Sequence, residues 1–127
     1  MFDLLHPGHT RIIERAKRLG AKLIVGVLTD SAAEAYKPTP VQSFKQRKEI
    51  VESLRAVDHI VTLRSSDATY LLKKLKPDIL VHGDDHHPDW EIGQTWMKNT
   101  GRQFVLLPYT KGISSSIIKA RIVERAI

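Results

Sequence analysis

The sequence predicts an α/β protein in which a doubly wound parallel sheet carries helices on both faces, giving three layers. Two observations predict this fold. Continuous apolar runs of the kind found in strands buried on both faces recur along the chain. Amphipathic segments with helical spacing, bounded by glycine, proline and serine, separate these runs. Residues 1–127 are enough for a single domain, and we expect one.

The first expected element is an amphipathic helix that begins near Gly8. Apolar residues follow at helical spacing as far as Leu19, and Gly20 stands at the C′ position. His6 and His9 therefore lie at a helix start, beside backbone N–H groups that have no partner within the helix. Such a start binds anions, because the positive end of the helix dipole lies behind it. We expect it to hold the phosphates of a nucleotide.

The remaining elements alternate along the chain. Ser43 and Gln46 have the spacing of a capping box, and two prolines in residues 38–40 exclude a helix there. We expect strands at residues 22–28, 59–63, 78–82 and 103–107, and further helices at residues 32–36, 43–55, 66–76, 90–100 and 114–126.

A strand should also precede the first turn, but Met1 stands directly before it. We therefore expect the sheet to lack its first, central strand and the phosphate site to lack one wall. Whether a chain of only these residues is active is left open.

The composition narrows the class of protein. No apolar run approaches the ~20 residues of a membrane span, so we expect a cytoplasmic protein without a membrane partner. Cysteine is absent, which excludes disulfides and thiolate metal sites. The formal charge of +6 suits phosphate-bearing partners, either nucleotides or nucleic acid.

The candidate functional residues, which are runs of serine, histidine and aspartate, lie in the turns that follow the expected strands. In doubly wound sheets, ligands bind beyond the carboxyl ends of the strands. Ser114, Ser115 and Ser116 open the last helix and can form a second phosphate cradle. The histidines and aspartates in residues 82–89 resemble metal ligands in type, but their spacing fits no closed zinc motif, so we expect no metal held by the protein.

Five motifs in order resemble the HxGH nucleotidyltransferase superfamily, and within it the small cytidylyltransferases, which share a Rossmann-like fold. The motifs occupy residues 2–9, 28–30, 54–58, 82–85 and 112–116. Two subgroups compete, the glycerol-3-phosphate cytidylyltransferases and the cytidylyltransferase domains of phosphonate pathways. Residues 35–37, 81–85 and 108–112 favour the second, and the first has arginine where this chain has Tyr109.

The resemblance implies attack by a phosphate or phosphonate oxygen on the α-phosphorus of CTP, with release of pyrophosphate. Mg²⁺ would be bound chiefly through the nucleotide phosphates, and a homodimer is implied. The implied catalytic residues are His6, His9, Lys37 and Ser115. The implied nucleotide contacts are Phe2, Gly8, Arg55, Asp84, Asp85, Gly112, Ile113, Ser114 and Ser116. Asp30 and Tyr109 are the implied contacts to the acceptor.

Three alternatives stay open at this point. An adenylyltransferase of the same fold would act on a sugar phosphate or a flavin, because the HxGH and serine motifs do not choose the base. A nucleic-acid-binding module fits the charge, although the chain has no RNA-binding aromatic signature, and we expect no nucleic-acid partner. A non-catalytic nucleotide sensor would bind CTP without turnover.

Overall fold

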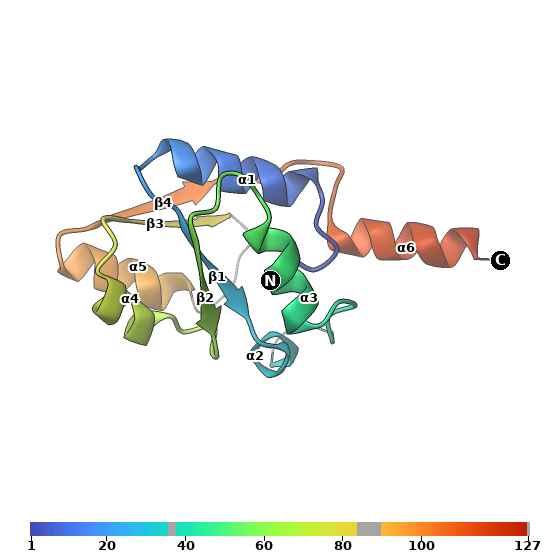
Figure 1. Ribbon diagram of the computed structural model, residues 1–127, viewed down its shortest axis with the longest axis horizontal. Helices are drawn as coiled ribbons and strands as arrows, with labels where there is room; N and C mark the ends of the chain where they lie inside the picture. The colour runs from blue at the N-terminus through green and yellow to red at the C-terminus, as the bar shows by residue number, and fades with distance from the viewer. Residues whose placement is uncertain (36–37, 84–89, 127) are drawn as a thin grey trace.

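Figure 1 shows a computed structural model of the chain, which describes residues 1–35, 38–83 and 90–126. Strands and helices alternate along it, as the sequence predicts. The elements are α1 (Pro7–Arg18), β1 (Ile24–Leu28), α2 (Asp30–Glu34), α3 (Phe44–Glu52), β2 (His59–Leu63), α4 (Thr69–Leu75), β3 (Ile79–Gly83), α5 (Trp90–Asn99), β4 (Gln103–Leu107) and α6 (Ser115–Arg125).

The strands form two parallel pairs. β1 pairs with β2, with Ile24 opposite His59, and β3 pairs with β4, with Ile79 opposite Gln103. Within the described ranges no backbone ladder joins the two pairs. The sheet therefore has the gap that the sequence predicts. All pairings are parallel, in agreement with the predicted Rossmann-like α/β fold.

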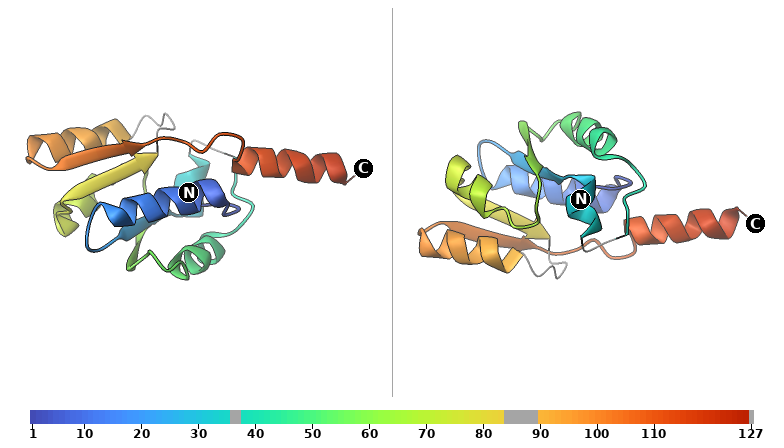
Figure 2. Two further views of the ribbon diagram at one scale, coloured as in Figure 1. Left: turned by 90° about the horizontal axis from the view of Figure 1, so that it is seen from above. Right: turned by 90° about the horizontal axis from the view of Figure 1, so that it is seen from below.

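Helices cover both sides of the strands. α3 packs against β1 and β2, while α5 packs against β3 and β4, and Figure 2 shows these two helices on opposite sides of the strands. The main core joins Ile13 of α1, Val25 and Val27 of β1, and Val51 of α3. β1 thus buries the face that carries Val25 and Val27, whereas Ile24 is 39% exposed, so the strand is less completely buried than its continuous apolar run predicts.

The starts of α2 and α4 differ from the predicted starts. Thr29 accepts a hydrogen bond from the N–H of Ala32, so α2 begins at Asp30, two residues before the predicted start. Asp67 accepts from the N–H of Thr69, and α4 begins there rather than at residue 66. The capping box of α3 is confirmed, because Ser43 and Gln46 bond reciprocally at 3.3 and 3.1 Å.

The last helix, α6, extends away from the rest of the chain (Figures 1 and 2). Ile122 and Val123 near its end are 58% and 68% exposed. The predicted homodimer, in which a second chain would contact this one, stays a prediction. None of the helices in the described residues is long and apolar enough to cross a membrane.

Candidate functional site

The first turn of α1 is capped by its own histidines. His6 is the N-cap residue, and its Nδ1 accepts a hydrogen bond from the N–H of Gly8 at 3.0 Å. Nδ1 of His9 accepts from the N–H of His6 at 3.2 Å, and the two rings stack with centroids 3.8 Å apart. Because Nδ1 is an acceptor in both rings, the neutral imidazoles carry their protons on Nε2 and are donors there.

The charge state of His6 agrees with this arrangement. Burial lowers the pKa of His6 below its ordinary value of 6.5, so the ring is neutral near pH 7. A neutral imidazole with Nδ1 bonded to the backbone has its Nε2–H fixed in direction. Both rings are thereby oriented as hydrogen-bond donors at the positive end of α1.

Gly8 is required by the ring of His6. A Cβ at this position would lie 2.8 Å from Cε1 and 2.9 Å from Nδ1 of His6, closer than real side chains approach. The same Cβ would lie 3.6 Å from Cγ2 of Ile113, which precedes α6. Gly8 is therefore the point where the start of α1 lies close to the turn that leads into α6.

The turn ahead of α1 has an uncommon backbone. Phe2 and Leu4 both have positive φ, 59° and 50°, which side chains with a Cβ rarely adopt. The ring of Phe2 lies 5.5 Å from the ring of His9, between centroids. The turn places Phe2 beside the histidine pair, where the resemblance implies a nucleotide contact.

The start of α6 meets this same turn. Ser114 caps the helix, since its hydroxyl accepts from the N–H of Ile117 at 3.1 Å. The hydroxyl of Ser115 donates to the carbonyl oxygen of Asp3 at 2.5 Å. Ser116 is exposed on the first turn, and Gly112 has a positive φ of 81°. The structure therefore brings the two helix starts together from opposite ends of the chain, as the sequence predicts.

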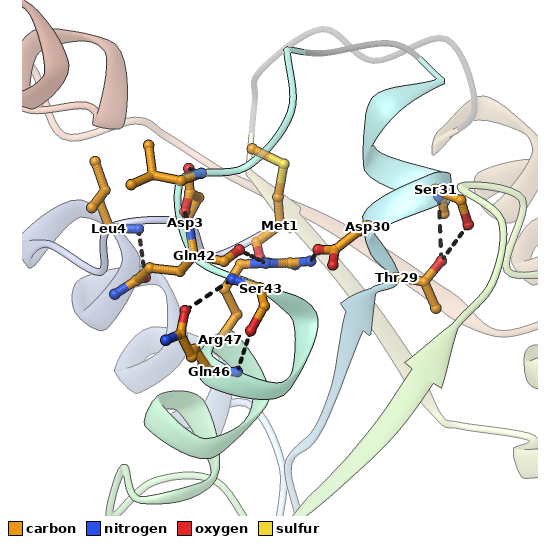
Figure 3. A network of polar contacts seen from close by, with 12 residues as sticks. Met1, Asp3, Leu4, Thr29, Asp30, Ser31, Gln42, Ser43, Gln46 and Arg47 are labelled. Atoms are coloured by element: carbon orange, nitrogen blue, oxygen red, sulfur yellow. Dashed lines mark hydrogen bonds and ion pairs between the residues drawn. The ribbon is translucent and has the colours of Figure 1, made fainter.

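Asp30 forms an ion pair that the sequence analysis missed. Its Oδ1 accepts from Nη2 of Arg47 at 2.7 Å, and Arg47 is completely buried (Figure 3). Arg47 also donates to the carbonyl oxygens of Gln42 and Met1, at 3.1 and 2.9 Å. Arg47 stands four residues before the buried Val51, so a charge on the apolar side of α3 was the signal in the sequence.

Asp3 is the second buried charge that the sequence analysis missed. Its carboxylate accepts from the N–H groups of Val41 and Gln42, both at 2.9 Å, and lies 3.6 Å from Nζ of Lys119. Burial raises the pKa of Asp3, but the two amide hydrogen bonds and Lys119 outweigh burial and hold that pKa below its ordinary value. Lys119 stands one helical turn after Ser115, a spacing that the sequence displays.

Within the described residues, the structure does not bring the other predicted site residues into the contacts that join the two helix starts. Arg55 lines a small pocket of about 80 Å³ between α1 and the segment after α3, together with Thr10 and Glu14. Tyr109 follows β4 and is 52% exposed. The predicted contacts Lys37, Asp84 and Asp85 lie outside the described residues.

A metal site is the remaining candidate. Within residues 1–35, 38–83 and 90–126, no group of three or more histidine, aspartate or glutamate side chains could hold a metal ion. The cluster in residues 82–89 lies mostly outside these ranges. The carboxylate of Asp3 already accepts two backbone N–H groups, and that of Asp30 already accepts a hydrogen bond from Arg47. The described part of the site offers hydrogen-bond donors, the Nε2–H groups of His6 and His9.

The site has the form of a phosphate-binding centre made by two helix starts. A comparison with known families gives the family of the chain that forms it. The sequence model of the family described as Cytidylyltransferase-like matches residues 1–121. The chain belongs to this family. This membership confirms the resemblance to the HxGH nucleotidyltransferases that motifs at both ends of the sequence indicate.

Two relatives of this cytidylyltransferase-like chain are an FAD synthase and a bifunctional protein HldE. An FAD synthase of Ferroglobus placidus is 33% identical over 123 residues, which are 97% of this chain and 73% of that protein. A bifunctional protein HldE of Gluconobacter oxydans is 37% identical over 117 residues, which are 91% of this chain. The chain spans about a quarter of the length of the HldE proteins that it matches, 24% in this case.

A solved structure agrees with these sequence relatives. The lipopolysaccharide core biosynthesis protein of Thermoplasma volcanium superposes with a TM-score of 0.74 at 27% identity. The match covers 89% of this chain and 93% of that one. The cytidylyltransferase-like fold is thereby confirmed, while the choice of CTP stays a prediction.

Proposed function

We propose that this chain transfers a nucleoside monophosphate from a nucleoside triphosphate to a small phosphate-bearing acceptor and releases pyrophosphate. One observation carries the proposal. The start of α6 is bonded to the turn that precedes α1, through Ser115 and Asp3. Two helix N-termini, one with paired imidazole donors and one with serine hydroxyls, therefore face one region, and this arrangement suits a triphosphate.

The reaction needs no covalent intermediate. An oxygen of the acceptor phosphate attacks the α-phosphorus, and the bond from that phosphorus to the bridging oxygen of pyrophosphate breaks. Negative charge develops on the phosphoryl oxygens and on the leaving group. Nε2–H donors of His6 and His9, and backbone N–H groups in the first turn of α6, would stabilise that charge by hydrogen bonding, whereas the N–H groups of Gly8 and His9 at the start of α1 are already bonded to His6.

The other predicted residues have proposed roles around this centre. Lys37 would bring a cation to the α-phosphate, and Ser116, Gly112 and Ile113 would present the α6 turn to the β- and γ-phosphates. Arg55, Asp84 and Asp85 would contact the nucleoside, and Asp30 and Tyr109 the acceptor. Mg²⁺ would be bound by the nucleotide phosphates and would neutralise part of their charge.

We favour ATP as the donor. The FAD synthase relative is matched over 73% of its own length, and FAD contains an adenylyl group joined to a flavin phosphate. This support favours the adenylyltransferase alternative, with a sugar phosphate or a flavin phosphate as acceptor. CTP is the second candidate, because the five motifs taken together resemble those of the small cytidylyltransferases.

Pyrophosphate release tests the proposal directly. The assay pairs each of the four nucleoside triphosphates with flavin mononucleotide, a hexose 1-phosphate, glycerol-3-phosphate and 2-aminoethylphosphonate, in the presence of Mg²⁺. We expect release with ATP and one acceptor, and no release without an acceptor. Pyrophosphate release with CTP and an acceptor, but with none of the other three triphosphates, would favour the second candidate. Binding of a triphosphate without release from any pair would favour the non-catalytic sensor instead.

A further inference from the structure

Asp3 lies at the meeting point of three segments that are far apart in the sequence. It is 1% exposed, yet it carries a carboxylate. Both oxygens of that carboxylate accept a backbone N–H, one from Val41 and one from Gln42. A buried carboxylate is costly unless such bonds compensate for lost water, so these contacts fasten the turn before α1 to the segment before α3.

The turn before α1, which these contacts hold, is also the turn whose backbone has positive φ values. Phe2 and Leu4, on either side of Asp3, both have positive φ. The N–H of Leu4 donates to Oε1 of Gln42 at 3.0 Å, a second bond between the same two segments. A turn with two such residues persists only where its surroundings hold it, and here Asp3 and Gln42 supply the contacts that hold it.

The third segment is the start of α6. The carbonyl oxygen of Asp3 accepts the hydroxyl of Ser115, and its carboxylate lies 3.6 Å from Nζ of Lys119. One residue thus contacts the turn that leads to His6 and the first turns of α6. Its carboxylate is buried and saturated with protein donors, so Asp3 is not itself a ligand for phosphate.

We propose that Asp3 is a positioning residue, which sets the α6 start against the imidazole pair of α1 and so fixes the geometry of the triphosphate site. The inference rests on the proposed function, because the site that Asp3 positions is the one assigned there. Its action passes through the strained turn to His6 and through Ser115 to α6. A small displacement at Asp3 would move two sets of donors relative to each other.

Asp3→Asn is the primary test. The amide keeps the size of the side chain but has one acceptor oxygen, so it loses one of the two backbone bonds and the attraction to Lys119. We expect kcat for pyrophosphate release to fall by at least ~10-fold, with a smaller change in the KM for the nucleotide, as lost positioning predicts. Ser115→Ala removes the hydrogen bond to the carbonyl oxygen of Asp3, and Gln42→Leu removes the bond to the N–H of Leu4. Each should lower kcat by less than Asp3→Asn does.

Leu72→Ala is the matched control for stability. Leu72 is buried on α4, outside the core cluster against which Phe2 and Leu5 pack, and its truncation lowers the free energy of unfolding. Assayed well below its melting temperature, Leu72→Ala should keep wild-type kcat per folded molecule. If Asp3→Asn behaves like this control, with kcat unchanged once folded, the positioning role is overturned.

A spectroscopic measurement separates this inference from the proposed function. In ¹⁵N-labelled protein without nucleotide, Asp3→Asn should shift the amide signals of both helix starts, at Gly8 and His9 and at Ser115 and Ser116. Gln42→Leu should shift the same set if Asp3→Asn does not fold. Unchanged signals at either helix start would overturn the inference, whereas absence of pyrophosphate release from wild type would overturn only the proposed function.

Discussion

The hydroxyl of Ser115 donates a hydrogen bond to the carbonyl oxygen of Asp3 at 2.5 Å, joining residues 112 positions apart. This bond connects the two ends of the sequence at one place in the fold. Asp3 lies in the turn that leads to α1 and Ser115 begins α6, so their contact brings two positive helix ends together. Positive helix ends favour anions, of which the buried Asp3 carboxylate supplies one and the proposed triphosphate would supply more.

His9→Ala is expected to reduce pyrophosphate release by at least ~100-fold, the scale on which loss of one oxyanion-type donor acts. The substitution also removes the acceptor for the N–H of His6. Turnover at saturating nucleotide and acceptor measures the effect. His59→Ala is the control, because His59 begins β2 at the opposite end of that strand from the site. A near-normal rate for His9→Ala would exclude His9 from the mechanism.

Gly8→Ala should weaken triphosphate binding by displacing the ring of His6. The added methyl would lie 2.8 Å from Cε1 of His6, so the ring must move and its bond to the N–H of Gly8 is lost. Calorimetric titration with the triphosphate measures the loss, which we expect to be at least ~10-fold. Gly20→Ala is the matched control, since a Cβ there meets nothing closer than 4.0 Å. Equal affinities for the two variants would contradict the placement of His6.

The free energy of unfolding should decrease as pH falls from 6.5 toward the pKa of His6 in the folded chain. Its folded pKa lies below the ordinary value of 6.5, so below pH 6.5 the unfolded chain takes up a proton before the folded chain does. The free energy of unfolding is therefore highest above pH 6.5 and decreases as pH falls toward the folded pKa. Urea unfolding at several pH values between 5 and 8 measures this slope.

His6→Asn should reduce that slope. Asparagine keeps an N-cap acceptor but does not titrate, so the part of the pH dependence that belongs to His6 disappears. The slope of the wild-type chain, measured under the same conditions, is the reference. A slope unchanged in His6→Asn would mean that His6 has the same pKa in both states.

Arg47→Met should destabilise the fold by about 2–3 kcal/mol, because it leaves buried carbonyl groups without donors. Arg47 is fully buried and donates to Met1, Gln42 and Asp30. Asp30→Asn is the milder partner variant, since the Asp30 side chain is 46% exposed and water can replace its lost contact. Denaturant unfolding compares the two, and equal losses would contradict this account of the network.

Much of the fold follows from local pattern. β2 and β4 occupy the predicted residues 59–63 and 103–107, because each is a short apolar run bounded by polar residues. The boundaries of α2 and α4 were less predictable. The start of α2 depends on which of several neighbouring polar side chains caps it, and Thr29 does so. The N-cap residue of α4 is Ala68, which has no side-chain cap, so no polar residue in the sequence marks that start.

The site was predictable only in part, for a different physical reason. The histidine motif and the serine run identify the helix starts, and parallel topology brings them to one edge of the sheet. The residues that hold those starts are buried charges, Asp3 and Arg47. Charged residues are buried only when paired, and the partners of Asp3 are backbone amides at Val41 and Gln42, which a sequence does not mark.

The central claim is that the two helix starts bind one triphosphate together. An NMR titration of ¹⁵N-labelled protein with the Mg²⁺ complexes of ATP and CTP tests it most directly. The account predicts that the amides of Gly8 and His9 shift together with those of Ser115 and Ser116, along one saturation curve with a single Kd. Shifts confined to one helix start, or two curves with different Kd values, would contradict it.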